Sequence, residues 1–258
     1  MSDDNHASGA LARRALALLD LTVLADDATA DGARDLCRRA VSGPVPVAAV
    51  CLWPRFVAVA REALGDSPVR IATVVNFPDG DTPIAPVIRE TEAALQAGAD
   101  EIDLVLPWRA VLAGQVTAAA AMVRNVRMRC GDKLLKVILE TGEYPDLDKV
   151  RIAAELAIAS GADFIKTSTG KTAHSASIPA ARMMLSVIAM TARPVGLKPS
   201  GGIRTLADAR GYLDLADATM GAGWATPQRF RFGASGLYGA LVAAIAGGDA
   251  AGPKAGTY

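Results

Sequence analysis

Three ionisable residues interrupt segments that are otherwise rich in aliphatic side chains. Asp103 lies within EIDLVL, Lys166 ends ADFIK and Lys198 ends PVGLK. Burial disfavours the ammonium form of a lysine, and a second lysine beside it lowers the pKa further. A lysine whose pKa falls from its usual ~10.4 toward ~7–8 carries a neutral amine, which can attack a carbonyl carbon. The residue types therefore indicate covalent carbonyl chemistry at a lysine.

The intervals between these residues match a repeating structural unit. Asp103 and Lys166 are 63 residues apart, and Lys166 and Lys198 are 32 apart. A strand, a helix and two short loops need roughly 30 residues. The intervals therefore correspond to about two such units and one, which would place Asp103, Lys166 and Lys198 at a similar height along successive strands. An alternative stays open, in which each lysine pairs with a carboxylate such as Asp103 or Glu140 and has a structural role.

The elements that must position these residues alternate along the chain. Short segments rich in β-branched residues are followed by longer Ala-rich segments of helical period, as in βα units around a parallel sheet. We predict strands at 47–52, 70–76, 101–106, 134–139, 163–167, 194–198 and 231–234, with a weak strand near 218–220. We predict helices at 55–64, 84–97, 116–129, 148–159, 179–191, 206–215 and 236–246, and an extra helix at 11–19 before the first strand. Eight strands in 258 residues predict a (β/α)8 TIM barrel.

The chain contains no evident linker, since Pro and Gly lie mainly at the ends of the predicted elements. Residues 1–258 are therefore expected to form one barrel domain, with 247–258 as a flexible C-terminal tail that ends in Tyr258. A dinucleotide-binding sheet would need GxGxxG after its first strand, and Trp53-Pro54-Arg55 stands there instead. The barrel is favoured over a doubly wound sheet.

Two loops late in the chain have the features of a phosphate site. PSGGIRT, which contains Gly201 and Gly202, opens into a predicted helix, and FGASG, which contains Gly233, Ser235 and Gly236, precedes another. Backbone amides at a helix N-terminus attract anions, and barrels often bind phosphate with their late loops. The loops predict a phosphorylated substrate.

Composition and charge exclude several classes of protein. The chain is 51% hydrophobic with 27 Lys+Arg against 27 Asp+Glu, which argues against disorder and against a nucleic-acid-binding protein. No segment reaches the roughly 20 apolar residues of a membrane span, and the N-terminal MSDDNHASGALARR lacks the pattern of a secretory signal. We therefore expect a cytoplasmic protein.

Cysteine and histidine usage excludes a disulfide framework and a zinc site. Cys37, Cys51 and Cys130 are odd in number and lack CxxC spacing, so we expect each to be a buried thiol. His6 lies in a polar N-terminal segment and His174 in a Ser/Ala-rich loop, so no pair of histidines has the spacing of a ligand motif. No metal and no cofactor are expected.

The segment GADFIKTSTGK, residues 161–171, resembles the signature of deoxyribose-phosphate aldolases, which are Schiff-base aldolases on a (β/α)8 barrel. Further matching segments follow the same order from near the start of the chain almost to its end: LLDLTVLADDAT, VCLWPRF, ATVVNFPDG, EIDLVLPWRA, KVILETGE, GLKPSGGIRT and FRFGASGL. The resemblance implies a class I aldolase. Its reaction would be the reversible cleavage of 2-deoxy-D-ribose 5-phosphate to D-glyceraldehyde 3-phosphate and acetaldehyde.

The resemblance also implies roles for individual residues. Lys166 would form the Schiff base, Lys198 would lower its pKa, and Asp103 would shuttle a proton through an ordered water. Tyr258 could deliver or order that proton if the tail folds over the barrel mouth. The residues implied in supporting the polar network are Asp20 and Lys171, and those implied in holding the phosphate are Gly201, Gly202, Gly233 and Ser235. The family pattern GASS here reads GASG, so only the backbone amide of Gly236 remains at the last position.

Two other functions stay open. Another Schiff-base barrel lyase, transaldolase-like or acting on a keto acid, would share the lysine and the phosphate loop but leaves the second lysine unexplained. A catalytically silent phosphosugar-binding barrel would use both lysines only to neutralise an anion. The expected partners are a small phosphosugar and acetaldehyde, and the fold class admits a homodimer.

Overall fold

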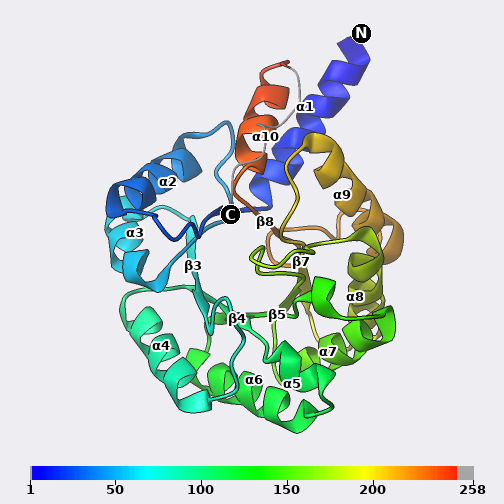
Figure 1. Cartoon of the computed structure of the whole chain (residues 1–258). Helices are drawn as coiled ribbons and strands as arrows, with labels where there is room; N and C mark the ends of the chain where they lie inside the picture. The colour runs from blue at the N-terminus through cyan, green and yellow to red at the C-terminus, as the bar shows by residue number, and fades with distance from the viewer. Residues whose placement is uncertain (1, 249–258) are drawn as a thin grey trace.

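Eight parallel strands form the centre of the protein, in a computed structural model that describes residues 2–248. The strand order is β7-β6-β5-β4-β3-β2-β1-β8, with every neighbouring pair parallel. Figure 1 shows them at the centre of a ring of helices. The strands are β1 (Leu19–Val23), β2 (Ala49–Leu52), β3 (Arg70–Val75), β4 (Glu101–Val105), β5 (Leu134–Ile138), β6 (Phe164–Lys166), β7 (Gly196–Lys198) and β8 (Phe232–Ala234).

The last two strands complete the circle. Isolated parallel bridges join Leu197 to Phe230 and Ser200 to Gly233, so β7 lies beside β8. Eight strands alternating with helices around a nearly closed sheet are a (β/α)8 TIM barrel, and this prediction is confirmed.

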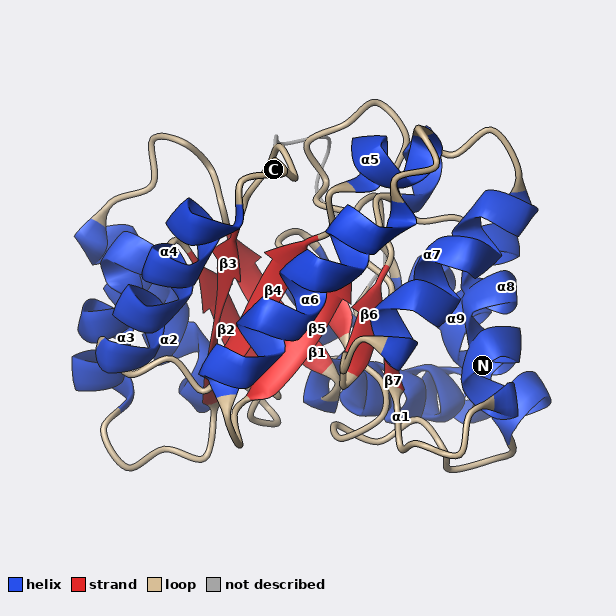
Figure 2. Cartoon of the chain, turned by 90° about the horizontal axis from the view of Figure 1, so that it is seen from below, coloured by secondary structure: helices blue, strands red, loops and turns tan. Residues whose placement is uncertain are grey.

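The helices form the outer layer around the strands (Figure 2). α1 precedes the first strand and packs against α10 and α9, so the expected extra N-terminal helix is present. Within residues 2–248, no helix has the length and apolar character needed to cross a bilayer. The helices are α1 (Ser2–Ala17), α2 (Ala30–Ser42), α3 (Val57–Leu64), α4 (Ile84–Gln96), α5 (Trp108–Leu112), α6 (Val116–Cys130), α7 (Leu147–Ala159), α8 (Ile178–Met190), α9 (Leu206–Met220) and α10 (Leu237–Ile245), with short 3-10 turns η1 (Pro54–Phe56) and η2 (Thr141–Glu143).

One predicted strand is wrong and one observed strand is not among the predictions, so the two errors cancel in the number of strands. The strand predicted at 218–220 is the last turn of α9, whereas β1 begins at Leu19, where the helix predicted at 11–19 should end. β1 carries Asp20 and Thr22 at alternate positions, which hides the apolar pattern of a strand. The helices α2 and α5 were also not predicted. The count of eight strands is therefore right although one strand was misplaced.

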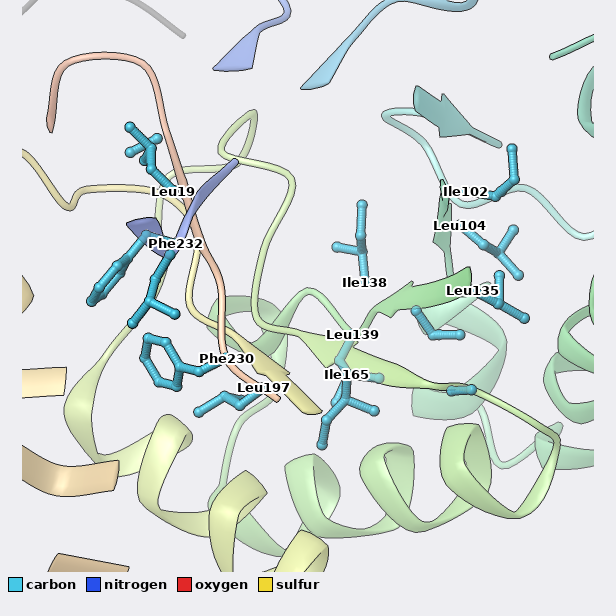
Figure 3. Close-up of a cluster of buried hydrophobic side chains, with 14 of the residues drawn as sticks. Leu19, Ile102, Leu104, Leu135, Ile138, Leu139, Ile165, Leu197, Phe230 and Phe232 are labelled. Carbon is cyan, nitrogen blue, oxygen red and sulfur yellow. The ribbon is translucent and has the colours of Figure 1, made fainter. Parts of the chain in front are cut away.

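Alternation along the strands separates an apolar outer face from a polar interior. Ile102 and Leu104 of β4 belong to the hydrophobic core that also includes Ile165 and Leu197 (Figure 3). The residues that alternate with these along each strand, such as Asp103 between Ile102 and Leu104, therefore point into the barrel. This geometry places the ionisable side chains of successive strands together at the barrel centre.

The helix that follows β7 has a complete N-terminal cap. Thr205 Oγ1 accepts a hydrogen bond from the backbone N–H of Asp208 at 3.0 Å, and Asp208 Oδ2 accepts one from the N–H of Thr205 at 2.9 Å. This reciprocal arrangement satisfies two backbone donors at the start of α9 and fixes how the preceding loop enters the helix.

Removal of this cap is expected to destabilise the protein measurably. Thr205→Ala should lower the free energy of unfolding by about 1 kcal/mol, because a backbone donor at the start of α9 loses its partner. Urea denaturation measures the change. The control Thr117→Ala, at an exposed position within α6, removes the same atoms without removing a helix cap. Equal stability of the two variants would contradict the expected role of Thr205.

Candidate active site

Lys166 and Lys198 lie side by side at the carboxyl ends of β6 and β7, where they are register partners. Both amines donate to the same oxygen, Oδ2 of Asp103, at 3.0 Å from Lys166 and 2.8 Å from Lys198. The Lys166 side chain is 2% exposed and the other two are fully buried. The structure thus brings together the three residues that the sequence singled out.

The two lysines differ in the number of carboxylates they contact. Lys198 Nζ also donates to Asp20 Oδ2 at 2.5 Å, whereas Lys166 has an ion pair only with Asp103 among the described residues. Burial lowers the pKa of Lys166 and Lys198 lowers it further, against the opposing effect of Asp103. Burial also disfavours the charge of Lys198, but Asp103 and Asp20 outweigh it and raise the Lys198 pKa well above its usual value. The geometry therefore shifts Lys166 toward its amine form and holds Lys198 as an ammonium.

Asp103 remains a carboxylate at the centre of this group. Burial alone would raise its pKa, but Lys136, Lys198 and Lys166 outweigh burial and hold the pKa well below the usual value. Its carboxylate accepts hydrogen bonds from the amines of Lys136, Lys166 and Lys198, so both of its oxygens are occupied. The thiol of Cys51 also lies close to these charges, but burial raises its pKa and so disfavours the reactive thiolate.

The structure adds three charged residues that the sequence did not point to. Lys136 Nζ donates to Asp103 Oδ1 at 2.9 Å and to Glu101 Oε2 at 2.5 Å. The guanidinium of Arg231 contacts Asp20 Oδ1 at 2.6 Å and Glu101 Oε1 at 2.9 Å. The available signal is their position within or beside apolar strands: Glu101 is two residues from Asp103, and Lys136 is about one barrel unit from it.

Glu140, considered above as a partner for a lysine, contacts the loop after β6 instead. Its carboxylate accepts hydrogen bonds from the hydroxyl of Thr169 at 2.6 Å and from the backbone N–H of the same residue. Its own backbone lies in the left-handed region at φ 60°, an uncommon conformation for a residue other than glycine. Glu140 therefore fixes the segment that directly follows Lys166.

Lys171 and the loops after β1 and β6 meet at the same end of the barrel. Lys171 Nζ contacts Asp26 Oδ1 at 3.1 Å, and its backbone N–H donates to Thr169 Oγ1 at 3.0 Å. Asp20, the other residue expected to support the polar network, lies deeper and pairs with Lys198. Lys171 and Asp20 thus each contact a charged group, Lys171 at the end of the barrel and Asp20 deeper inside it.

The two glycine-rich loops lie next to each other at the carboxyl ends of the strands. Gly201 and Gly202 have φ values of 88° and 82°, which favour glycine, and the loop continues into α9. Gly236 is the N-cap residue of α10, and Ser235 before it is exposed. The bridge from Ser200 to Gly233 brings the two loops together, so their backbone amides lie close in space. Tyr258 and residues 249–257 of the predicted tail lie outside the described residues.

Gly233 leaves room for the side chains beside it. A Cβ atom at this position would lie 2.5 Å from Ser200 Oγ and 2.9 Å from Lys198 Cε, both too close for real contacts. Gly233→Ala should therefore lower the free energy of unfolding by about 1–3 kcal/mol, the usual cost of overpacking. Urea denaturation measures this loss. Gly239→Ala in α10 is the control, because its Cβ has nothing within 4 Å, and a similar loss there would contradict the steric explanation.

Comparison with known proteins gives one consistent family. A profile described as DeoC/LacD family aldolase matches residues 14–237. The chain is 53% identical over 238 residues to a deoxyribose-phosphate aldolase of Agrobacterium fabrum, covering 92% of each chain. A structure from Toxoplasma gondii ME49, provisionally assigned as a deoxyribose-phosphate aldolase, has a TM-score of 0.86 and 26% identity over 95% of this chain and 100% of that one.

A second structural neighbour shows the shared fold. The deoxyribose phosphate aldolase of Aeropyrum pernix, which is described as a tetramer, has a TM-score of 0.74 and 24% identity over 94% of this chain and 97% of that one. The profile match covers most of the chain, and so does the alignment to the Agrobacterium fabrum enzyme. The chain belongs to the DeoC/LacD family of aldolases.

Proposed function

We propose that this aldolase reversibly cleaves 2-deoxy-D-ribose 5-phosphate to D-glyceraldehyde 3-phosphate and acetaldehyde through a Schiff base on Lys166. The observation that carries the proposal is that the buried amines of Lys166 and Lys198 meet at one oxygen of Asp103 at the carboxyl end of the barrel, where burial and Lys198 lower the pKa of Lys166. The identity of 53% to a deoxyribose-phosphate aldolase over most of the chain supports the choice of substrate.

In the first half of the reaction, the neutral amine of Lys166 adds to the aldehyde carbon of the open-chain sugar. Lys198 is proposed to give a proton to the hydroxyl of the adduct, which leaves as water, and the resulting protonated imine draws electrons from the neighbouring carbons. Transfer of the C3 hydroxyl proton through a water molecule to the proposed carrier Asp103 then breaks the C2–C3 bond and releases D-glyceraldehyde 3-phosphate. The bond's electrons pass to the nitrogen, which leaves an enamine on Lys166.

In the second half, the enamine carbon takes up a proton and water hydrolyses the imine to release acetaldehyde. Asp103, with a water molecule, is the proposed proton carrier, and Lys198 is the proposed source of positive charge and protons beside it. Asp103 and Lys198 are in contact with each other, and both lie next to Lys166. Tyr258 is proposed to deliver or order the same proton.

The phosphate group is proposed to bind where the late glycine-rich loops meet. Gly201, Gly202 and Gly233 are the proposed backbone contacts, with the exposed hydroxyl of Ser235 and the amide of Gly236 completing the site. Lys171 and Asp20 are proposed to support the polar contacts around the sugar. Helix N-termini favour anions, which supports phosphate at the starts of α9 and α10.

Neither alternative function is favoured. A catalytically silent phosphosugar-binding barrel gives no reason for two neighbouring lysines to differ, whereas the pKa of Lys166 is lowered and that of Lys198 is raised. Another Schiff-base lyase would share Lys166, but the 53% identity is to a deoxyribose-phosphate aldolase.

We also propose that the enzyme is a single-domain protein of the cytoplasm that forms a homodimer. One hydrophobic cluster includes residues from Ala12 to Ala244, which supports one barrel domain. The three cysteines Cys37, Cys51 and Cys130 are free and buried, as is usual in a reducing cytoplasm. The tetramer described for the Aeropyrum pernix relative supports self-association, here proposed as a homodimer.

Covalent trapping tests the proposed nucleophile. After incubation with acetaldehyde or 2-deoxy-D-ribose 5-phosphate, borohydride should reduce the imine to a stable adduct on Lys166, identified by peptide mass spectrometry. Lys166→Arg is the control and should give no adduct at that position. Failure to find an adduct on Lys166 in the unmodified sequence would refute the aldolase mechanism proposed here.

Loss of the second lysine should change the pH dependence of the reaction. Lys198→Leu removes a positive charge that lowers the pKa of Lys166, so that pKa should rise and the acid limb of kcat/KM should move to higher pH. At neutral pH, kcat/KM should fall by about 100-fold or more, because a proton donor is also lost. Lys149→Leu on α7 is the control. An acid limb unchanged by Lys198→Leu would contradict the coupling.

A further inference from the structure

Six charged side chains form a closed ring of hydrogen bonds inside the barrel, in which carboxylates and cations alternate. None is more than 5% exposed. We call this set the charge ring, and its members in order are Glu101, Lys136, Asp103, Lys198, Asp20 and Arg231.

The two lysines of the ring each join a pair of carboxylates. Lys136 lies 2.5 Å from Glu101 and 2.9 Å from Asp103, while Lys198 lies 2.8 Å from Asp103 and 2.5 Å from Asp20. The amine of Lys136 is also 3.6 Å from Asp20. Each lysine therefore has a carboxylate on both sides, and neither carries an unbalanced charge.

Arg231 closes the ring at the amino end of the barrel. Its guanidinium contacts Asp20 at 2.6 Å and Glu101 at 2.9 Å. Arg231 and Glu101 also line a polar pocket of about 360 Å³, together with Arg70 and Asp132 from the loops and strand ends at the same face. The ring thus extends from beneath Lys166 to the end of the barrel opposite the glycine-rich loops.

Charge balance in the ring bears directly on Lys166. Three carboxylates and three cations make the ring neutral, and Lys166 contacts it only through Asp103 Oδ2. An ammonium on Lys166 would therefore add one unbalanced positive charge to a buried cluster, which is costly. The amine form of Lys166 leaves the cluster neutral.

We propose that Glu101 and Arg231 are positioning residues that set the protonation state of Lys166 through the charge balance of the ring. Neither contacts Lys166, so both act through Lys136, Asp20 and the residues that follow in the ring. The inference rests on the proposed function only in treating the amine of Lys166 as the nucleophile.

Among the described residues, the other charged and titratable groups near Lys166 are the same in every ring variant. Asp103 on β4 and Lys198 on β7 belong to the ring, and Cys51 on β2 holds its proton because burial raises its pKa. Glu140, which follows β5, lies outside the ring: Thr169 is its hydrogen-bond partner, and burial raises its pKa while Lys166 lowers it. The raised pKa values of Lys136, Lys198 and Arg231 agree with their places between carboxylates.

Substitutions at the far side of the ring should shift the pKa of Lys166 in opposite directions. Arg231→Met leaves three carboxylates with two cations, so an ammonium on Lys166 restores balance and its pKa should rise. Glu101→Gln leaves three cations with two carboxylates, so the pKa of Lys166 should fall. The double variant has two carboxylates and two cations in the ring, so the pKa of Lys166 should return close to its value in the unsubstituted protein.

Lysine titration by NMR reads this effect in the full chain without any substrate. The chain has seven lysines, so protein labelled with ¹³C at lysine Cε gives few signals, and Lys166→Met identifies one of them; the lysines are Lys133, Lys136, Lys149, Lys166, Lys171, Lys198 and Lys254. Each single variant should shift the pKa of Lys166 by about half a unit to one unit. The matched controls Arg38→Gln and Asp35→Asn make the same charge changes in an exposed pair on α2 and should leave the pKa unchanged.

The outcomes separate this inference from the proposed function. Shifts in the same direction, or no shift in either ring variant, would overturn the role of Glu101 and Arg231 even if borohydride trapping succeeds at Lys166. Opposite shifts with no trapped adduct would support the ring and refute the aldolase mechanism. If Arg231→Met does not fold, the double variant must still titrate above Glu101→Gln. Failure of every ring variant to fold would make the ring a folding element and overturn the proposal.

Discussion

The site depends on one electrostatic constraint, which is that charges buried inside the barrel must balance. Asp20, Glu101 and Asp103 are almost completely removed from solvent, and an unpaired carboxylate there would cost on the order of several kcal/mol. Each has cations within hydrogen-bond distance, supplied by Lys136, Lys198 and Arg231. Lys166 is the one lysine beside these six groups that lies outside their balance, so the arrangement that stabilises the interior also lowers the pKa of Lys166.

Barrel geometry brings these groups together. β4 and β7 are not neighbours in the sheet, so the contact between Asp103 and Lys198 crosses the interior. Ile102 and Leu104 belong to the hydrophobic core between the strands and the helices (Figure 3). Side-chain alternation along β4 therefore leaves Asp103 inside the barrel. The same closure that completes the barrel places Gly233 beside Lys198, where only a residue without a side chain leaves the lysine undisturbed.

The sequence predicts the barrel and the reactive trio because both leave local signals. A charge that ends an aliphatic segment is unusual, and this marks Lys166 and Lys198 without any knowledge of their neighbours. Polar residues hide other features: Asp20 and Thr22 face the interior and break the apolar pattern of β1, so that strand was missed. Glu101 begins β4 and Arg231 directly precedes β8, positions where a charge is ordinarily a solvated boundary residue, whereas Lys136 lies in the middle of β5. Only the pairing of β4 with β5 and of β8 with β1 reveals that they meet.

The barrel also separates the control of charge from the binding of substrate. At the carboxyl ends, Glu140 ties down the loop after β6, and the contact of Lys171 with Asp26 joins that loop to the one after β1. These contacts shape the mouth in which a sugar phosphate is proposed to bind. The opposite edge of the charge ring faces a polar pocket at the amino ends of the strands. A change of charge at that edge alters the electrostatic energy of Lys166 while leaving the contacts of the mouth in place. Changes at Glu101 and Arg231 can therefore alter the protonation of the nucleophile while the loops proposed to bind the phosphate stay the same.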